Sequence, residues 1–200
     1  KEPTAQIICD LNYPSGEPSK IAPRQVLKNI IGQLSDENLR AVVAPELEFY
    51  LCEQNLDPDL PLKTPVGKSG RRETGSRVFG IDAVNEFDKL TDDIYDYCEL
   101  MNIGVDTLVH ESGPSQIEIN LNHGDPLALA DQAFMFKRAV RQVALKHNIH
   151  ATFMAKPYQG QPGSSMHIHQ NLVSAETGKN LFSDKEGNNS KEYFQFIGGL

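Results

Sequence analysis

Two glutamates placed two residues apart are the first side chains in this sequence that could do chemistry. Glu46 and Glu48 lie in residues 40–53, where side-chain character alternates as it does in a β-strand. Strand residues two apart project from the same face, so the two carboxylates should lie side by side. They stay ionised only if a cation or a basic cluster compensates their repulsion. A solvent-exposed strand edge would also explain the pair, but apolar neighbours such as Leu47 and Phe49 indicate an interior strand.

Two further glutamates flank a turn that contains glycine and proline. Glu111 ends a predicted strand at 105–111, and Glu118 lies in a second predicted strand at 116–122, on the same face as Asn120. The turn at residues 113–115 can bring both carboxylates to one end of a sheet. Glu118 could equally be an ordinary residue on the polar face of its strand.

A pair of histidines follows on a later predicted strand. His167 and His169 share one face of residues 165–173, directly after Gly163-Ser164-Ser165. Such a pair is common in metal and phosphate sites, because imidazole can be a neutral ligand or a cationic donor, although surface histidines also produce it.

Four carboxylates and one imidazole on neighbouring strands resemble a cage for hard divalent ions. A ligand set rich in oxygen favours magnesium or manganese over zinc. Two such ions could clamp a polyphosphate during phosphoryl transfer. The sequence contains neither GxxxxGK[ST] nor GxGxxG, which argues against a P-loop or Rossmann nucleotide site. The four remaining histidines show no comparable spacing and are expected to be structural: His110, His123, His147 and His150.

The elements that must position these residues predict an α+β fold with a largely antiparallel sheet and packed helices. Helices are predicted from Pro23 to about Leu34, over Ala83–Met101, and from Asp125-Pro126 to near His147. The other predicted elements are strands at 4–11, 151–156 and 165–173, a long loop at 55–77, and a hairpin around Thr177-Gly178.

The composition indicates a folded protein and argues against nucleic acid and membrane spans. The 200 residues, 39% of them hydrophobic and 23% charged, suit a folded domain with or without a fragment of another. A net charge of −8 argues against nucleic acid as a partner, and no apolar run is long enough for a membrane span. Cys9, Cys52 and Cys98 form no CxxC pair, so we expect small core residues in a reducing cytoplasm. The start at Lys1 suggests a piece of a longer polypeptide.

Four segments together resemble the consecutive motifs of the glutamine synthetase family, and they occur in the family's order. They are APELEFYL (44–51), HESGPSQIEIN (110–120), ATFMAKP (151–157) and GSSMHIHQNL (163–172). The resemblance implies that residues 1–20 are the end of an N-terminal β-grasp domain and its linker. It also implies that residues 21–200 are the first half of the catalytic domain, so the fold would be incomplete at both ends. Residues 122–157 are most similar to the γ-glutamylpolyamine synthetase branch.

The resemblance implies a role for each of the five candidate metal ligands. Glu48, Glu111 and Glu118 match ligands of the ion that helps to bind glutamate. Glu46 and His167 match ligands of the ion that lies with the ATP phosphates. Both ions would be magnesium or manganese.

It also implies roles for residues around these ions. His169 matches the catalytic histidine that contacts the transferred phosphate, and Asn171 lies where the family commonly has a serine near the ATP nucleotide. Gly163 matches a glycine of the glutamate-binding loop. Pro162 stands where the ammonia-using enzymes usually carry asparagine, so this loop is expected to differ in shape.

The implied activity is an ATP-dependent ligase of polyamine and nitrogen metabolism. ATP would phosphorylate the γ-carboxylate of glutamate, and putrescine or a similar amine would displace the phosphate. The alternatives are an ammonia-using glutamine synthetase, a non-catalytic binding or regulatory protein, and a hydrolase with a carboxylate-bridged metal pair. The family implies a homo-oligomeric ring at full length. It also implies that a third ligand for the ATP-side ion, the catalytic arginines, the flap glutamate and an aspartate latch lie outside this chain. The isolated chain is therefore expected to bind metal weakly and to show no turnover.

Overall fold

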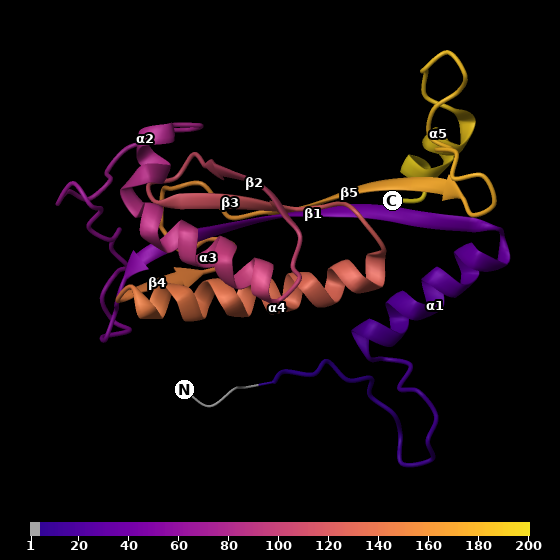
Figure 1. Ribbon diagram of the computed structural model, residues 1–200, viewed down its shortest axis with the longest axis horizontal. Coiled ribbons are helices and arrows are strands. Elements are labelled where there is room, and N and C mark those ends of the chain that lie inside the picture. The colour runs from indigo at the N-terminus through magenta and orange to yellow at the C-terminus, as the bar shows by residue number, and fades with distance from the viewer. Residues whose placement is uncertain (1–4) are drawn as a thin grey trace. The chain divides into compact units, whose positions relative to one another are not determined.

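The computed structural model describes residues 5–200 as helices interspersed with strands of one sheet (Figure 1). The elements in chain order are α1 (Pro23–Asp36), β1 (Leu39–Glu53), α2 (Ile81–Val84), the 3-10 helix η1 (Asn85–Phe87), α3 (Asp88–Leu100), β2 (Val105–His110), β3 (Gln116–Leu121), α4 (Pro126–Lys146), β4 (Ile149–Thr152), β5 (Met166–Ser174) and α5 (Lys191–Gly198). The strand pairs β1–β3, β1–β4 and β2–β3 are antiparallel, which confirms the predicted α+β class. Within this range, no helix is long and apolar enough to cross a membrane.

The chain forms two compact units, which are described separately. One contains the described residues up to Val43, with Gly124–Asp131 and His169–Leu200. The other contains Ala44–His123 and Gln132–Ile168, and it holds most of the sheet.

The sheet has the strand order β2-β3-β1-β4, and β5 also pairs with β1. In the register between β1 and β3, Glu46 lies opposite Asn120 and Glu48 lies directly opposite Glu118. Residues that are opposite each other in an antiparallel pair project from the same face. The two predicted acidic strands are therefore neighbours, and their carboxylates share one face.

The other face of the sheet is the core. It carries Leu47, Phe49, Leu51, Ile117 and Ile119, all of which are 0–1% exposed. The Phe153 ring lies between Phe49 of β1 and Phe136 of α4, with ring centroids 5.1 Å and 6.4 Å away. Helices α3 and α4 run along this side of the sheet (Figure 1). Burial of the apolar face fixes which face of each strand can carry polar groups.

The predicted helix at Ala83–Met101 is present but divided into α2, η1 and α3. Phe87, with φ −125° and ψ 28°, leaves the helical conformation at the junction and is itself buried. The end of α3 is tied to the end of α4 by two contacts. His147 Nε2 lies 2.9 Å from Asp93 Oδ2, and Lys146 Nζ donates to the Tyr97 hydroxyl at 2.8 Å. These contacts agree with the structural role expected for His147.

The first unit contains the predicted helix α1, which begins at Pro23. Its apolar stripe is not buried within this unit, since no α1 residue is classed as buried. The predicted hairpin is confirmed by the bridge between Val173 and Asn180. Helix α5 was not predicted; Ser190 caps its start, and the Ser190 hydroxyl accepts a hydrogen bond from Tyr193 N.

Several sequence-based expectations need correction. Thr4 lies outside the described residues, and no strand forms over residues 5–11. Cys9 is exposed and is not a core residue, whereas Cys52 and Cys98 are buried as expected. The fourth strand ends at Thr152, because the chain turns away there toward the glycine-containing loop that precedes β5.

Candidate metal centre

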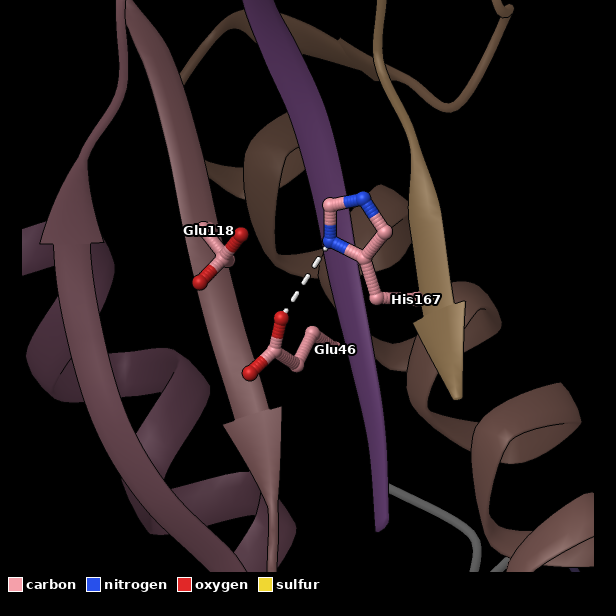
Figure 2. A group of neighbouring side chains, drawn as sticks. All are labelled: Glu46, Glu118 and His167. Carbon is pink, nitrogen blue, oxygen red and sulfur yellow. Dashed lines mark hydrogen bonds and ion pairs between the residues drawn. The ribbon is translucent and has the colours of Figure 1, made fainter. Parts of the chain in front are cut away.

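Three of the five predicted ligands meet on the polar face of the sheet. Glu46 of β1, Glu118 of β3 and His167 of β5 each offer one ligand atom, and these atoms all lie within 4.8 Å of one another (Figure 2). His167 Nδ1 is 3.3 Å from Glu46 Oε2. The group exists because β1 lies between β3 and β5, so each strand contributes one side chain.

Glu48 lies next to this group but has other partners. Its side chain is buried, and its Oε2 accepts from Gln116 Nε2 at 2.8 Å and from Ser165 N at 3.2 Å. Its Oε1 accepts a hydrogen bond from the Ser165 hydroxyl. The carboxylate is thus held by neutral donors, and Oε1, with a single hydrogen-bond donor, keeps a lone pair for an ion.

Glu111 lies just beyond the end of β2. One oxygen of its carboxylate accepts from Ser112 N at 3.2 Å, and its backbone N donates to Gln116 O at 2.9 Å. Glu111 is not one of the three clustered side chains, but repulsion from its charge helps to raise the pKa of Glu118.

The electrostatics of the site reflect four neighbouring carboxylates. Burial raises the pKa of the Glu118 carboxyl, and repulsion from Glu46, Glu111 and Glu48 raises it further. Burial also raises the pKa of Tyr50 to about 12, with smaller contributions from Glu48 and Glu111. An ion bound at this face would relieve that repulsion.

The donor set fits a hard divalent cation. Two carboxylates and one imidazole converge, two more carboxylates are adjacent, and no thiolate takes part. Oxygen-rich ligation of this kind suits magnesium or manganese. The assignment of particular residues to two separate ions stays a prediction.

Gly163 lies in a loop that is pressed against the sheet. Its carbonyl accepts from Gln116 Nε2 at 3.0 Å, and the preceding Pro162 carbonyl accepts from the Tyr50 hydroxyl at 2.7 Å. A Cβ added at Gly163 would lie 2.7 Å from the Ala155 carbonyl oxygen. The close approach of the two backbones therefore requires glycine at this position.

His169 and Asn171 belong to the other unit, on β5. Both are exposed, and Asn171 Oδ1 accepts from Asn180 Nδ2 at 3.3 Å. Their roles at the transferred phosphate and the nucleotide stay predictions.

Glu73, in the long loop, was not among the predicted site residues, and its side chain is only 9% exposed. Its Oε2 accepts from Ser115 N at 2.6 Å and lies 2.8 Å from His110 Nε2. His110 is fully buried, and its Nδ1 lies 2.8 Å from the Glu111 carbonyl oxygen, an acceptor to which that nitrogen must donate. The pair ties the loop to the turn that presents Glu111. No local pattern distinguishes Glu73 from the other charged residues of the loop.

Gln116 was also missed, although a signal was present. It lies two residues before Glu118, so strand alternation places it on the same face. It is 0% exposed and contacts both Glu48 and the loop at Gly163.

Comparison with known proteins agrees with the motifs. The family model described as "Glutamine synthetase, catalytic domain" matches residues 20–200. The chain is 39% identical to γ-glutamylputrescine synthetase PuuA of Escherichia coli (strain K12) over 98% of its own length and 42% of that protein. It is 34% identical to glutamine synthetase of Pyrococcus abyssi (strain GE5 / Orsay) over 94% of its length and 40% of that protein.

Solved structures also show similarity to glutamine synthetases. A structure titled "Apo GmaS without ligand" superposes with a TM-score of 0.80 at 28% identity, covering 96% of this chain and 43% of that one. The cryo-EM structure of Plasmodium falciparum glutamine synthetase also gives a TM-score of 0.80, at 25% identity, covering 96% of this chain and 42% of that one. The chain thus spans well under half the length of these relatives. With its motifs, its fold and its sequence in agreement, the chain belongs to the glutamine synthetase family.

Proposed function

We propose that the full-length protein is an ATP-dependent ligase that joins the γ-carboxylate of glutamate to an amine such as putrescine. The convergence of Glu46, Glu118 and His167 on one sheet face, with two more carboxylates adjacent, carries this proposal. Membership of the glutamine synthetase family supports the ligase class. The 39% identity to a γ-glutamylputrescine synthetase supports an amine as the second substrate.

The reaction needs activation of an unreactive group. A carboxylate is a poor electrophile, so ATP would transfer its γ-phosphoryl group to glutamate, and the resulting acyl phosphate would have a good leaving group. The unprotonated amine would then attack the carbonyl carbon and phosphate would depart. Magnesium or manganese would supply electrostatic stabilisation of the polyphosphate when bound.

Different residues of this chain would bind the divalent ion, glutamate and ATP. Glu46, Glu118 and His167 would hold a divalent ion, and the Gly163 loop would hold glutamate beside them. His169 would contact the transferred phosphate, and Asn171 would lie near the nucleotide. We propose that residues 1–20 belong to the end of a β-grasp domain and its linker, and residues 21–200 to the first half of the catalytic domain.

Oligomeric state and location are further parts of the proposal. The family resemblance supports a homo-oligomeric ring at full length. All three cysteines are free thiols, which supports a reducing cytoplasm.

The second candidate is an ammonia-using glutamine synthetase. The chain is 36% identical to glutamine synthetase of Thermus thermophilus, close to the value for the putrescine enzyme. Pocket residues, not the fold, decide which nucleophile is used.

A substrate panel separates these functions. Full-length protein is incubated with ATP, manganese or magnesium, and glutamate, together with ammonia, putrescine, ethanolamine or a monoamine, and phosphate release is measured. We expect release that requires both glutamate and putrescine. Activity with ammonia alone would overturn the amine assignment, and release without any amine would overturn the ligase assignment. Glu46→Gln should abolish activity, while Glu99→Gln, an exposed carboxylate on α3, should not.

A further inference from the structure

We propose that Gln116 is a positioning residue that fixes the glutamate-binding loop against the ligand Glu48. This inference rests on the proposed function, because it assigns the Gly163 loop to substrate glutamate. Gln116 is 0% exposed, begins β3, and lies opposite Tyr50 of β1. A polar side chain that is buried completely must find partners for all its groups, and Gln116 does so.

The amide of Gln116 connects three separate segments. Its Nε2 donates to Glu48 Oε2 at 2.8 Å and to the Gly163 carbonyl at 3.0 Å. Its Oε1 accepts from Gly113 N at 2.9 Å, in the turn between β2 and β3. Both amide hydrogens and the amide oxygen are thus engaged.

These contacts fix the orientation of the amide. If the amide were flipped, its oxygen would face the Glu48 carboxylate and the Gly163 carbonyl, both of which are acceptors, and its NH2 group would face the Gly113 N–H. The two donors and one acceptor of glutamine match the three partners in one orientation. Glutamate at this position would offer no donors, and methionine would offer no strong polar group.

The loop is held at two other points by the same face of the sheet. The Tyr50 hydroxyl donates to the Pro162 carbonyl at 2.7 Å, and Ser165 N donates to Glu48 Oε2 at 3.2 Å. Glu48 Oε2 therefore accepts from both Gln116 and the loop. Glu48 Oε2 thus has two donors, whereas Oε1 accepts only from the Ser165 hydroxyl, so Oε1 is the oxygen with a lone pair left for an ion. Loss of the amide would loosen the loop and the ligand together.

The test uses Gln116→Glu and Gln116→Met in the full-length protein. The kinetic readouts are the KM for glutamate, the KM for ATP, and kcat. A readout independent of activity is hydrogen exchange of the Ser164 and Ser165 amides in the metal-free protein. We expect the KM for glutamate to rise about tenfold, as for loss of one hydrogen bond to a charged group, and the KM for ATP to stay within about twofold. Exchange of the two amides should accelerate by about tenfold.

The control is Gln132→Glu. Gln132 is also a partly buried glutamine that binds backbone, since its Oε1 accepts from Gly104 N at 3.2 Å, but it lies on α4 and does not contact the loop. It should change neither the KM for glutamate nor the exchange of the loop amides.

The outcomes separate this inference from the proposed function. If the wild-type protein shows no phosphate release that depends on glutamate and amine, the proposed function fails, while the exchange data still test the positioning role. If the wild type is active but both Gln116 variants keep its KM for glutamate and its exchange rates, the positioning role is overturned. A lower kcat with unchanged KM and exchange would also overturn it. Misfolding of both variants, seen as a lost near-ultraviolet circular dichroism signal, would assign Gln116 to stability instead and overturn it.

Discussion

Replacing Glu118 with glutamine should stabilise the metal-free protein and, at the same time, remove most of its stabilisation by manganese. Glu118 lies directly opposite Glu48 in the β1–β3 register and within 4.8 Å of ligand atoms of Glu46 and His167. Glutamine keeps the size of the side chain and removes its negative charge. The substitution therefore relieves repulsion in the metal-free state and deletes a ligand in the metal-bound state.

The charge arrangement sets the size of the first effect, and mass action sets the size of the second. Like charges directly opposite each other across a strand pair cost about 0.2–1 kcal/mol. Glu118 lies opposite Glu48 and is also repelled by Glu46 and Glu111, so we expect a gain of roughly 1 kcal/mol. For a chain of this length that gain raises the melting temperature by about 2–4 °C. Manganese at about one hundred times its Kd should stabilise the wild type by about 2.7 kcal/mol. That corresponds to roughly 5–10 °C, and the variant should lose most of it.

The pH dependence follows from the direction of the Glu118 shift. Its pKa in the folded protein is raised above the ordinary value of 4.5, chiefly by burial. A group with a raised pKa favours folding while it is protonated, and this contribution is lost as pH rises through the folded-state pKa. The variant and the wild type should therefore have similar stability near pH 4. The advantage of the variant should grow as the pH rises above 4.5.

The assay is thermal unfolding between pH 4 and pH 8, with either EDTA or manganese. Glu99→Gln serves as the matched control, because it removes one exposed carboxylate outside the site and should change neither quantity. A Glu118→Gln variant that is less stable than the wild type in EDTA at pH 7 would refute the repulsion argument. An undiminished manganese shift would refute its role as a ligand.

Three further outcomes are expected. Glu73→Ala leaves the buried His110 imidazole without its hydrogen-bonding partner and should lower the free energy of unfolding in urea by about 3 kcal/mol. Glu53→Gln removes a carboxylate from an exposed ion pair and should lower this free energy far less; equal losses would contradict the reasoning. Gly163→Ala should raise the KM for glutamate of the full-length protein, because the added methyl group would clash with the Ala155 carbonyl oxygen. Gly75→Ala, at a position with open space around it, should leave this KM unchanged, and steady-state kinetics of both variants check this. Only the exposed Cys9 should react rapidly with Ellman's reagent at pH 8, because burial raises the pKa of the Cys52 and Cys98 thiols to about 11. Rapid reaction of all three thiols in the native protein would show that Cys52 and Cys98 are not buried.

The polar face of the sheet could be predicted from local patterns. Alternation placed Glu46 and Glu48 on one face of β1 and Glu118 on one face of β3, because a strand has a period of two residues. The pairing that brings these strands together is not a local property. The register that sets Glu48 opposite Glu118, and the position of β5 beside β1, depend on packing of the apolar face against α3 and α4.

Other features depended entirely on distant contacts. Glu73 lies 37 residues before His110, in a segment whose composition predicts only a loop, so no nearby pattern indicates that its side chain contacts a buried imidazole. The division of the predicted helix near Phe87 reflects burial of that ring, which helical periodicity does not reveal. In the same way, the apolar pattern of α1 predicted a helix correctly but could not tell what covers its stripe.

The origin of the clustered ligands from three strands has a consequence for how the protein is made. Glu46 and His167 are 121 residues apart in the chain, so β1 and β3 leave the ribosome well before β5. Contacts of such long range form late, because the loop between them must first be closed. Until β5 pairs with β1, the site lacks the His167 imidazole, and of the three clustered ligands only Glu46 and Glu118 are in place. Capture of metal with the full ligand group should therefore mark the end of folding.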